Sequence, residues 1–312
     1  MNQTTNVILM IRPVAFRMNE QTAVNNYYQK VIDGLTPENV NQKAQEEFDT
    51  LVQKLKMVGV QVIVVHDTLK PDTPDSIFPN NWISFHENGD VVLYPMFAQN
   101  RRAERRDDIL DLLEQKGFFL NDIIDYTSAE REAVFLEGTG SLVFDRSNEK
   151  VYCALSSRSN EELLIEFCED FDMAPVIFEA YQTVNGSREL IYHTNVMMSI
   201  GEAFAIICAD CIDDKSQRKQ VLQSLKSDNK EIILITEEQV SKFAGNMLEV
   251  KGTDNKSYLI MSKSAHDSLS KAQIEKLEKH TTILTSNLDT IESCGGGSAR
   301  CMMAEVFLPR NN

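Results

Sequence analysis

Positive charge is what this sequence most clearly lacks. Lys and Arg total 31 residues against 47 Asp and Glu, so the formal net charge of the 312-residue chain is −16. A surface of this charge repels phosphate backbones and anionic lipid head groups, which argues against nucleic acids and membranes as partners. It suits a small cationic or zwitterionic substrate better, although an acidic surface also serves solubility alone.

Long hydrophobic runs are missing as well. The first apolar stretch, Val7 to Ile11, is too short for a signal-peptide core or a membrane span and has no basic flank. We therefore expect a cytoplasmic protein. The six cysteines, at positions 153, 168, 208, 211, 294 and 301, are too sparse and irregular for a disulfide framework. Each is then a core residue, a ligand or a nucleophile.

A repeated order of elements organises the chain. Val7 to Ile11 predicts a buried strand, Pro37 to Met57 a helix, and Val60 to Val65 a second buried strand. Four further copies, each with an extended pair, a helix and a closing strand, are predicted over 82–85, 91–95, 102–115 and 118–124; 142–144, 151–155, 160–171 and 175–180; 193–198, 204–208, 215–227 and 231–236; and 247–250, 258–261, 270–279 and 281–284.

These units recur roughly every 60 residues without letter-for-letter repetition, and each is of ββαβ type. Hairpin-like pairs such as 85–91 favour mixed sheets over the long parallel runs of a doubly wound sheet. No linker divides the chain into two parts. We therefore predict an α/β fold built as a ring of five small modules, in a single domain over residues 1–312.

The C-terminal segment Cys294-Gly-Gly-Gly-Ser-Ala-Arg-Cys301 places a cysteine directly after a glycine-rich loop. Glycines let a backbone approach a ligand closely. A phosphate loop is excluded because no Gly-Lys-Ser/Thr follows and the apolar stretch comes after the loop. Cys301 is then a candidate nucleophile, and a small buried residue of a C-terminal strand is the more ordinary alternative.

Three other segments carry polar residues at the edges of apolar runs. His193 enters an apolar strand, where a satisfied core histidine is the ordinary explanation. Glu137 lies between two apolar runs beside two glycines, and a buried acid needs a partner. Asn80 and Asn81 precede Trp82, the only tryptophan, where a capped strand entry and a ligand contact are both open.

Metal and redox sites have weak support in the sequence. Cys208-Ala-Asp-Cys211 has the spacing of such a site but no second pair and no nearby histidine. The histidines, at 66, 86, 193, 266 and 280, show no close ligand spacing. We therefore predict no metal and no cofactor. The charged run from Arg101 to Arg106 is predicted to be a solvated helix face.

Taken together and in this order, the segments resemble the guanidine-modifying pentein superfamily of arginine deiminases, dimethylarginine dimethylaminohydrolases and glycine amidinotransferases. The resemblance covers nearly the whole chain and looks closest to the bacterial amidinotransferase-like branch associated with citrulline utilisation. It implies a five-fold pseudosymmetric α/β propeller (pentein) with a central active-site channel. The segments that carry it are Arg12-Pro13, Asn80-Asn81-Trp82, Glu137-Gly-Thr-Gly-Ser141, His193-Thr-Asn195 and Gly-Gly-Gly-Ser-Ala-Arg-Cys301.

The resemblance also implies roles for individual residues. Cys301 matches the nucleophile, His193 the catalytic acid and base, and Glu137 the acid that supports it. A thiolate attacks the central carbon of a guanidinium, and one imidazole serves both the departing amine and the hydrolytic water. The substrate-binding candidates are Asn80, Asn81, Ser141, Asn195 and Arg300.

Departures from the family pattern concern the substrate. Arginine-specific members place carboxylates where this chain has Asn81, Ser141 and Asn195, so that only Glu137 is expected to keep its charge. Carboxylates grip a guanidinium through charge-assisted hydrogen bonds, whereas an amide both donates and accepts. A neutral ureido group, as in citrulline, is therefore as good a candidate substrate as arginine.

We predict a hydrolase that cleaves a C–N bond of a linear guanidino or ureido compound through a covalent cysteine adduct. An amidinotransferase, which shares the first half-reaction, is one alternative. A non-catalytic binding protein on the same scaffold, like the ribosome anti-association factors of this fold, is another. The expected partner is a small molecule, with no nucleic acid and no membrane, and a homodimer stays open.

Overall fold

Three-stranded sheets are the repeated feature of the computed structural model, which describes residues 1–311. Five such sheets occur in these residues, and in each the middle strand has one antiparallel and one parallel neighbour. One or two helices connect each parallel pair, because parallel neighbours need a crossover. The predicted α/β modules with mixed sheets are therefore confirmed.

Four sheets follow one another along the chain. Their elements are β3 (Ile83–Phe85), β4 (Val91–Leu93), α2 (Gln99–Arg102), α3 (Asp108–Gln115) and β5 (Ile123–Asp125); β6 (Val143–Asp145), β7 (Lys150–Ala154), α5 (Glu161–Asp170) and β8 (Ala174–Phe178); β11 (Met198–Ile200), β12 (Phe204–Ile207), α6 (Lys215–Ser227) and β13 (Glu231–Leu234); β14 (Leu248–Lys251), β15 (Ser257–Ser262), α8 (Lys263–Ser268), α9 (Lys271–Leu277) and β16 (Thr282–Ser286).

The remaining sheet joins the two ends of the chain. Strand β1 (Val7–Arg12) pairs parallel with β2 (Gln61–His66) and antiparallel with β17 (Ala304–Glu305), and α1 (Pro37–Met57) connects β1 to β2. Helix α1 has the bounds expected from the sequence. Thr36 caps its N-terminus, Pro37 takes its first turn, and Val40, Ala44, Phe48, Leu51 and Leu55 form its buried face.

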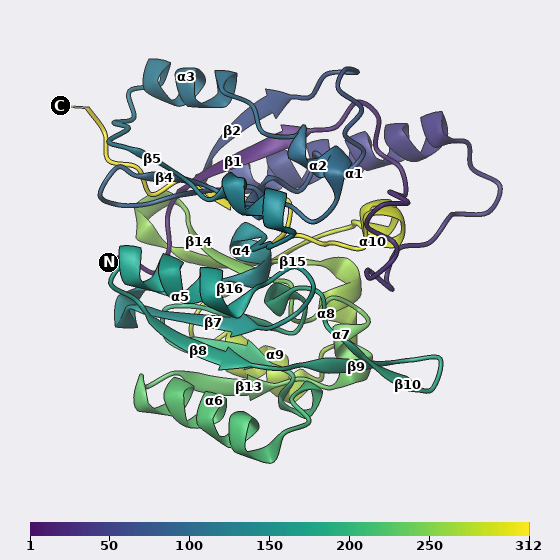
Figure 1. Cartoon of the computed structure of the whole chain (residues 1–312). Coiled ribbons are helices and arrows are strands. Elements are labelled where there is room, and N and C mark those ends of the chain that lie inside the picture. Colours follow the sequence, from purple (N-terminus) through teal and green to yellow (C-terminus); the bar gives the residue numbers. More distant parts are fainter. Residues whose placement is uncertain (312) are drawn as a thin grey trace.

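Short elements connect the modules. Helices α3 and α6 lie at opposite ends of the molecule as seen in Figure 1, and α4 lies near the middle of that view. The connecting elements are η1 (Pro79–Asn81), η2 (Thr127–Glu132), α4 (Gly138–Ser141), η3 (Arg146–Asn148), the hairpin β9 (Tyr181–Val184) and β10 (Ser187–Leu190), η4 (Thr194–Val196), η5 (Ala209–Cys211), α7 (Glu237–Val240), η6 (Thr253–Asn255) and α10 (Asp289–Gly295).

Two predicted elements are wrong in ways that bear on the site. The helix expected over 102–115 begins only at Asp108, and a separate helix, α2, ends at Arg102. Between them, Arg105 turns inward and donates to Tyr94 O. His193 does not enter a strand but precedes the short helix η4, and the strand begins only at Met198. Within residues 1–311, no helix is long and apolar enough to cross a membrane.

Candidate active site

The candidate site is built from the residues that precede the antiparallel edge strand of each sheet. Helix η1 comes before β3, α4 before β6 and η4 before β11, and α4 contacts both of the others. The fourth and fifth sheets contribute Asn246, just before β14, and Cys301, just before β17. The repeated module therefore brings together segments that are far apart in the sequence.

Close packing of these segments explains the glycines after Glu137. A Cβ on Gly140 would lie 2.3 Å from Asn81 Nδ2 and 2.8 Å from His193 Nδ1, distances that real side chains do not adopt. Gly138 has a φ of +41° and faces the carbonyl oxygen of Asn80. Glycine is thus required where the three short helices meet.

His193 and Glu137 form the polar centre of the site. His193 Nε2 lies 2.7 Å from Glu137 Oε2, and both residues are buried. The second carboxylate oxygen accepts from Phe97 N at 3.0 Å, and Arg158 Nη1 lies 3.4 Å from Oε2. Burial would raise the pKa of Glu137, but the charge of Arg158, the hydrogen bond from His193 and the charge of Arg101 together hold it well below its usual range.

The histidine is neutral in this setting. Burial, which the Glu137 carboxylate only partly offsets, lowers the pKa of His193 to about 4. Because an ionised carboxylate only accepts hydrogen bonds, the neutral ring must carry its proton on Nε2. Nδ1 is then left with its lone pair free, as a general base requires.

Cys301 is the sulfur of the site, and two amides contact it. Asn246 Nδ2 lies 3.2 Å from Sγ and Asn195 Nδ2 lies 3.6 Å from it. The thiol is buried, with 4% of the residue exposed, and it lines the same cavity as His193. Nucleophile candidate and base candidate therefore share one cavity.

That cavity is nearly closed. Its volume is about 20 Å³, which is room for about one water molecule, so a substrate enters only if part of the wall moves. The residues that line it are Thr22, Asn26, Asp75, Phe78, Asn81, Arg101, Arg158, Tyr192, His193, Gly295, Gly296, Gly297 and Cys301.

Buried charges surround the opposite side of the cavity. Arg101 pairs with Glu104 through two contacts of 2.9 Å and also donates to Asn81 Oδ1 at 2.8 Å. Burial raises the pKa of Glu104 to about 8 and also raises the pKa of Asp75, although Arg101 opposes both shifts. Asp75 Oδ1 and Asn81 Nδ2 are buried without a hydrogen-bond partner. Unpaired polar atoms at a cavity wall are suited to a ligand.

A family model described as N,N dimethylarginine dimethylhydrolase, eukaryotic, matches residues 12–308. The chain belongs to this family. Comparison with curated proteins gave no match. Membership of the dimethylarginine dimethylhydrolase family confirms the superfamily resemblance found in the sequence.

Solved structures share the fold of this family member. ArgZ, an arginine dihydrolase from the ornithine-ammonia cycle in cyanobacteria, has a TM-score of 0.73 at 19% identity, over 97% of this chain and 41% of that chain. The N-terminal domain of ArgZ bound to substrate has a TM-score of 0.70 at 18% identity, over 97% of this chain and 99% of that domain. A dimethylarginine dimethylaminohydrolase adduct with S-methyl-L-thiocitrulline has a TM-score of 0.64 at 14% identity, over 96% and 98%.

The chain thus corresponds to the N-terminal domain of ArgZ and to about two fifths of the full-length protein, 41%. The ArgZ domain has also been seen covalently bound to a reaction intermediate. These structures show that the chain shares their fold, and hydrolysis of a guanidino compound through a cysteine stays a prediction for it.

The residues predicted from sequence do not all reach the cavity. Cys301, His193 and Asn81 line it, and Asn195 and Glu137 lie directly behind them. Asn80 donates to Thr139 Oγ1 and Ser141 donates to Arg158 O, so both hold the surrounding backbone and side chains. The structure does not bring Arg300 to the cavity, because its guanidinium pairs with Glu305 and donates to Met303 O.

Other residues of the site were missed. Arg101 was assigned to a solvated helix face, and this is wrong, because its side chain is buried beside Glu104. Glu137 is the only carboxylate among the positions compared with the family, but Asp75 and Arg158, which were not considered, also line the cavity. Asn246 was detectable in principle, because it precedes the fifth predicted module in the place that the other site residues occupy in theirs.

Metal candidates gain no support from the structure. No group of three or more His, Cys, Asp or Glu side chains that could hold a metal ion occurs in residues 1–311. Cys208 and Cys211 are buried thiols flanking η5, and Cys211 lines a separate groove.

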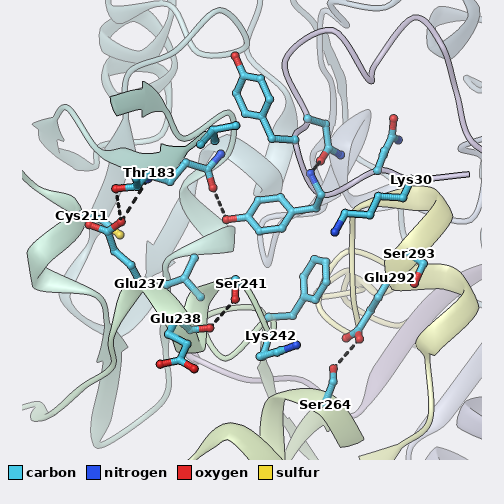
Figure 2. A pocket seen from close by; sticks show the side chains of 18 of the residues that line it. Lys30, Thr183, Cys211, Glu237, Glu238, Ser241, Lys242, Ser264, Glu292 and Ser293 are labelled. Atoms are coloured by element: carbon cyan, nitrogen blue, oxygen red, sulfur yellow. Dashed lines mark hydrogen bonds between the residues drawn. The ribbon is translucent and has the colours of Figure 1, made fainter. Parts of the chain in front are cut away.

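That groove, shown in Figure 2, has a volume of about 1020 Å³ and borders the catalytic cavity at Asn26. Two of the acids that line it accept from neighbouring hydroxyl groups: Glu237 accepts from Thr183, and Glu292 accepts from Ser264 (Figure 2). Among the residues that line the groove there is no pair like His193 and Glu137 beside a thiol. The smaller cavity, not the larger groove, is the candidate active site.

Proposed function

We propose that this chain hydrolyses a C–N bond of a linear guanidino or ureido amino acid, with Cys301 as nucleophile, His193 as acid and base, and Glu137 as the support of His193. The observation that carries the proposal is the cavity shared by Cys301 and a histidine whose other nitrogen lies 2.7 Å from a buried carboxylate. This is the arrangement of an activated nucleophile, a base and a group that orients the base.

In the first half-reaction, neutral His193 takes the thiol proton at Nδ1 while Cys301 Sγ attacks the central carbon. The C–N bond to the leaving group then breaks, and the imidazolium returns its proton to the departing nitrogen. A guanidino substrate leaves a thiouronium on Sγ, and a ureido substrate leaves a thiocarbamate. Either way the histidine is neutral again when the nitrogen has left.

In the second half-reaction, His193 Nδ1 takes a proton from a water molecule while the water oxygen attacks the carbon that is bonded to Cys301 Sγ. The S–C bond breaks with its electrons moving to sulfur, and the proton on His193 restores the thiol. Hydrolysis of a guanidino substrate yields a ureido compound. Hydrolysis of a ureido substrate yields a carbamate, which decomposes into an amine and carbon dioxide.

Asn81 and Asp75 are the groups that we expect to recognise the reacting head group. Arg101 carries donors only, so its contact with Asn81 Oδ1 fixes the amide with Nδ2 turned away from it as a free donor. Asp75 Oδ1 is a free acceptor. Guanidino and ureido groups both have N–H groups that can donate to Asp75. Only the ureido group has an oxygen that can accept from Asn81, which favours a citrulline-like substrate.

The fold supports a finer proposal about architecture. The five sheets form one domain over residues 1–312, arranged as a five-fold pseudosymmetric propeller around a central active-site channel. Each sheet supplies one segment to the site just before its antiparallel edge strand, which is the expectation for modules arranged around an axis. Cytoplasmic location, independence from metals and cofactors, and a homodimer stay predictions.

A substrate panel tests the reaction. Arginine, citrulline, methylarginines and agmatine would be incubated with the protein, and ammonia and urea release followed. We expect turnover that falls more than about a thousandfold in Cys301→Ala. Transfer of an amidino group to an added amine would indicate an amidinotransferase, and ligand binding without turnover would indicate a binding protein. Either outcome contradicts the proposal.

Calorimetric titration of Cys301→Ala tests the substrate preference. We expect citrulline to bind at least as tightly as arginine, and Asn81→Asp to shift the preference toward arginine because it replaces the free donor with an acceptor. Tighter arginine binding that Asn81→Asp leaves unimproved would mean that Asp75 alone determines the preference.

A further inference from the structure

Asn246 is the amide nearest to the sulfur of Cys301. Its Nδ2 lies 3.2 Å from Sγ, closer than the 3.6 Å of Asn195, and only 1% of the residue is exposed. It belongs to the fourth sheet, whose contribution to the site has no role in the chemistry described above.

The backbone before β14 is shaped to deliver this side chain. Phe243 adopts a φ of +61°, and its carbonyl oxygen accepts from Asn246 N at 2.9 Å, which closes a turn. A Cβ on Gly245 would lie 2.3 Å from Val196 O, so only glycine lets this turn pack against η4. Asn246 is thereby held between Asn195 and Cys301.

The orientation of the Asn246 amide is fixed by four hydrogen bonds. Oδ1 accepts from the backbone N–H groups of Arg300 and Cys301, at 3.1 and 3.4 Å. Nδ2 donates to Asn195 O at 3.0 Å and faces Sγ. If Oδ1 and Nδ2 were exchanged, Oδ1 would face the carbonyl oxygen of Asn195 and Nδ2 would face the N–H groups of Arg300 and Cys301. The amide atom at the sulfur is therefore the donor, Nδ2.

Asn195 differs in this respect. Its Nδ2 and its Oδ1 lie 3.6 and 3.8 Å from Sγ, so it can donate to a thiolate or accept from a thiol. Asn246 always offers a hydrogen to the sulfur, and such a bond is strongest when the sulfur is negative.

We propose that Asn246 is a catalytic residue that stabilises negative charge on Cys301 Sγ through its Nδ2 hydrogen. The role rests on the proposed nucleophile. Because the neighbouring imidazole is neutral at rest, no fixed cation is bonded to Sγ, and the amide supplies the stabilising dipole. It acts twice: when the proton leaves the thiol before the S–C bond forms, and when the S–C bond breaks and its electrons return to sulfur.

Ultraviolet absorbance of the thiolate, followed against pH, tests this without a substrate. The absorbance of the Cys301 thiolate is obtained by subtracting the absorbance of the same protein carrying Cys301→Ala. In Asn246→Ala, which removes the donor, we expect the midpoint to rise by roughly one to two pH units, a loss of about ten- to a hundredfold in thiolate below the midpoint. Asn246→Asp keeps an acceptor for Arg300 N and Cys301 N but places an oxygen at the sulfur, so its midpoint should rise further.

The matched control is Asn160→Asp, which retains the side-chain acceptor that caps α5 and should leave the midpoint unchanged. Circular dichroism and thermal melting report whether each variant is folded. An unchanged midpoint in a folded Asn246 variant overturns the proposal, and loss of the fold in both variants would show a structural role and overturn it equally. A shifted midpoint without turnover on the substrate panel would count against the proposed function alone.

Discussion

The two sides of the catalytic cavity differ in how their charges are held. On the acid–base side, His193 contacts Glu137 and lines the same cavity as Cys301, and all three residues lie in segments that resemble family motifs in the sequence. On the arginine side, Asp75, Arg101 and Arg158 are buried: Arg101 pairs with Glu104, three residues further along the chain, whereas Arg158 reaches Glu137 from another segment. The acid–base side performs the chemistry that we propose, and the arginine side orients the groups that bind the substrate.

The difference shows which kind of interaction a sequence reveals. Residues of the acid–base side stand beside glycines and apolar runs, so their burial can be expected from local pattern. Arg101 stands in a run of charged residues, and nothing local distinguishes it from Arg102 or Arg105, which are partly exposed. Only the tertiary packing of α2 against η1 makes it a buried residue.

The largest expected effect on activity is that of Glu137→Gln. A glutamine amide would donate to Nε2 of His193 and so move the ring proton to Nδ1, which removes the free base. We expect a loss of about a hundred- to ten-thousandfold in turnover with little change in substrate binding, by analogy with amide replacement in serine protease triads. Steady-state kinetics on the best substrate of the panel measures it.

The matched control is Glu130→Gln. Glu130 also accepts from a backbone N–H, that of Met96, and pairs with Arg105, but it does not contact the histidine. A comparable loss of activity in the control would show that the effect of Glu137→Gln comes from a general disturbance of buried charge. Equal activity of Glu137→Gln and the unmodified protein would remove His193 from the proposed role.

The next effect concerns stability on the arginine side. Measured above pH 8, where Glu104 is ionised, Arg101→Met leaves this carboxylate buried without its partner, which should lower the free energy of unfolding by about 3–5 kcal/mol. The double variant Arg101→Met/Glu104→Gln should recover part of that loss, because no uncompensated charge is left. Urea unfolding of the two single variants and the double variant gives the coupling energy. Strict additivity would mean that the pair contributes nothing beyond its separate members.

The fold was more predictable than the site. The helix from Pro37 to Met57 and the mixed sheets follow from hydrophobic periodicity and turn signals, which are local. The break between α2 and α3 was not predictable, because it depends on carbonyl groups of distant residues such as Tyr94 that accept from the arginines. Asp75 is a short polar residue whose importance comes from what the fold places beside it, and no local pattern encodes that.

His193 should make stability depend on pH. Its pKa is lowered to about 4 from 6.5, so the unfolded chain binds the proton more tightly. The resulting stability is fully present above pH 6.5 and is lost as the pH falls toward 4, by roughly 3 kcal/mol in total. Buried His86, whose pKa burial lowers well below 6.5, adds a loss of the same sign.

Urea unfolding at several pH values separates the two histidines. His193→Gln and His86→Gln should each flatten the pH dependence between 6.5 and 4, and the double variant should flatten it further. A slope that His193→Gln leaves unchanged would show that the site histidine titrates near its ordinary pKa. It would then gain its proton at a higher pH, and the step in which neutral His193 acts as a base would need revision.

The smallest expected effect sharpens the comparison from outside the cavity. Arg12 and Asp49 form a two-contact pair with distances of 2.8 Å, a geometry close to that of Arg101 and Glu104, but their side chains are 25% and 53% exposed. Water screens this pair, so a double-mutant cycle with Arg12→Ala and Asp49→Ala should give a coupling of about 0.2–1 kcal/mol that falls with added salt. A coupling as large as that of the buried pair would mean that the two-contact geometry, rather than burial, determines what such a pair contributes, and the contrast between surface and cavity arginines would then fail.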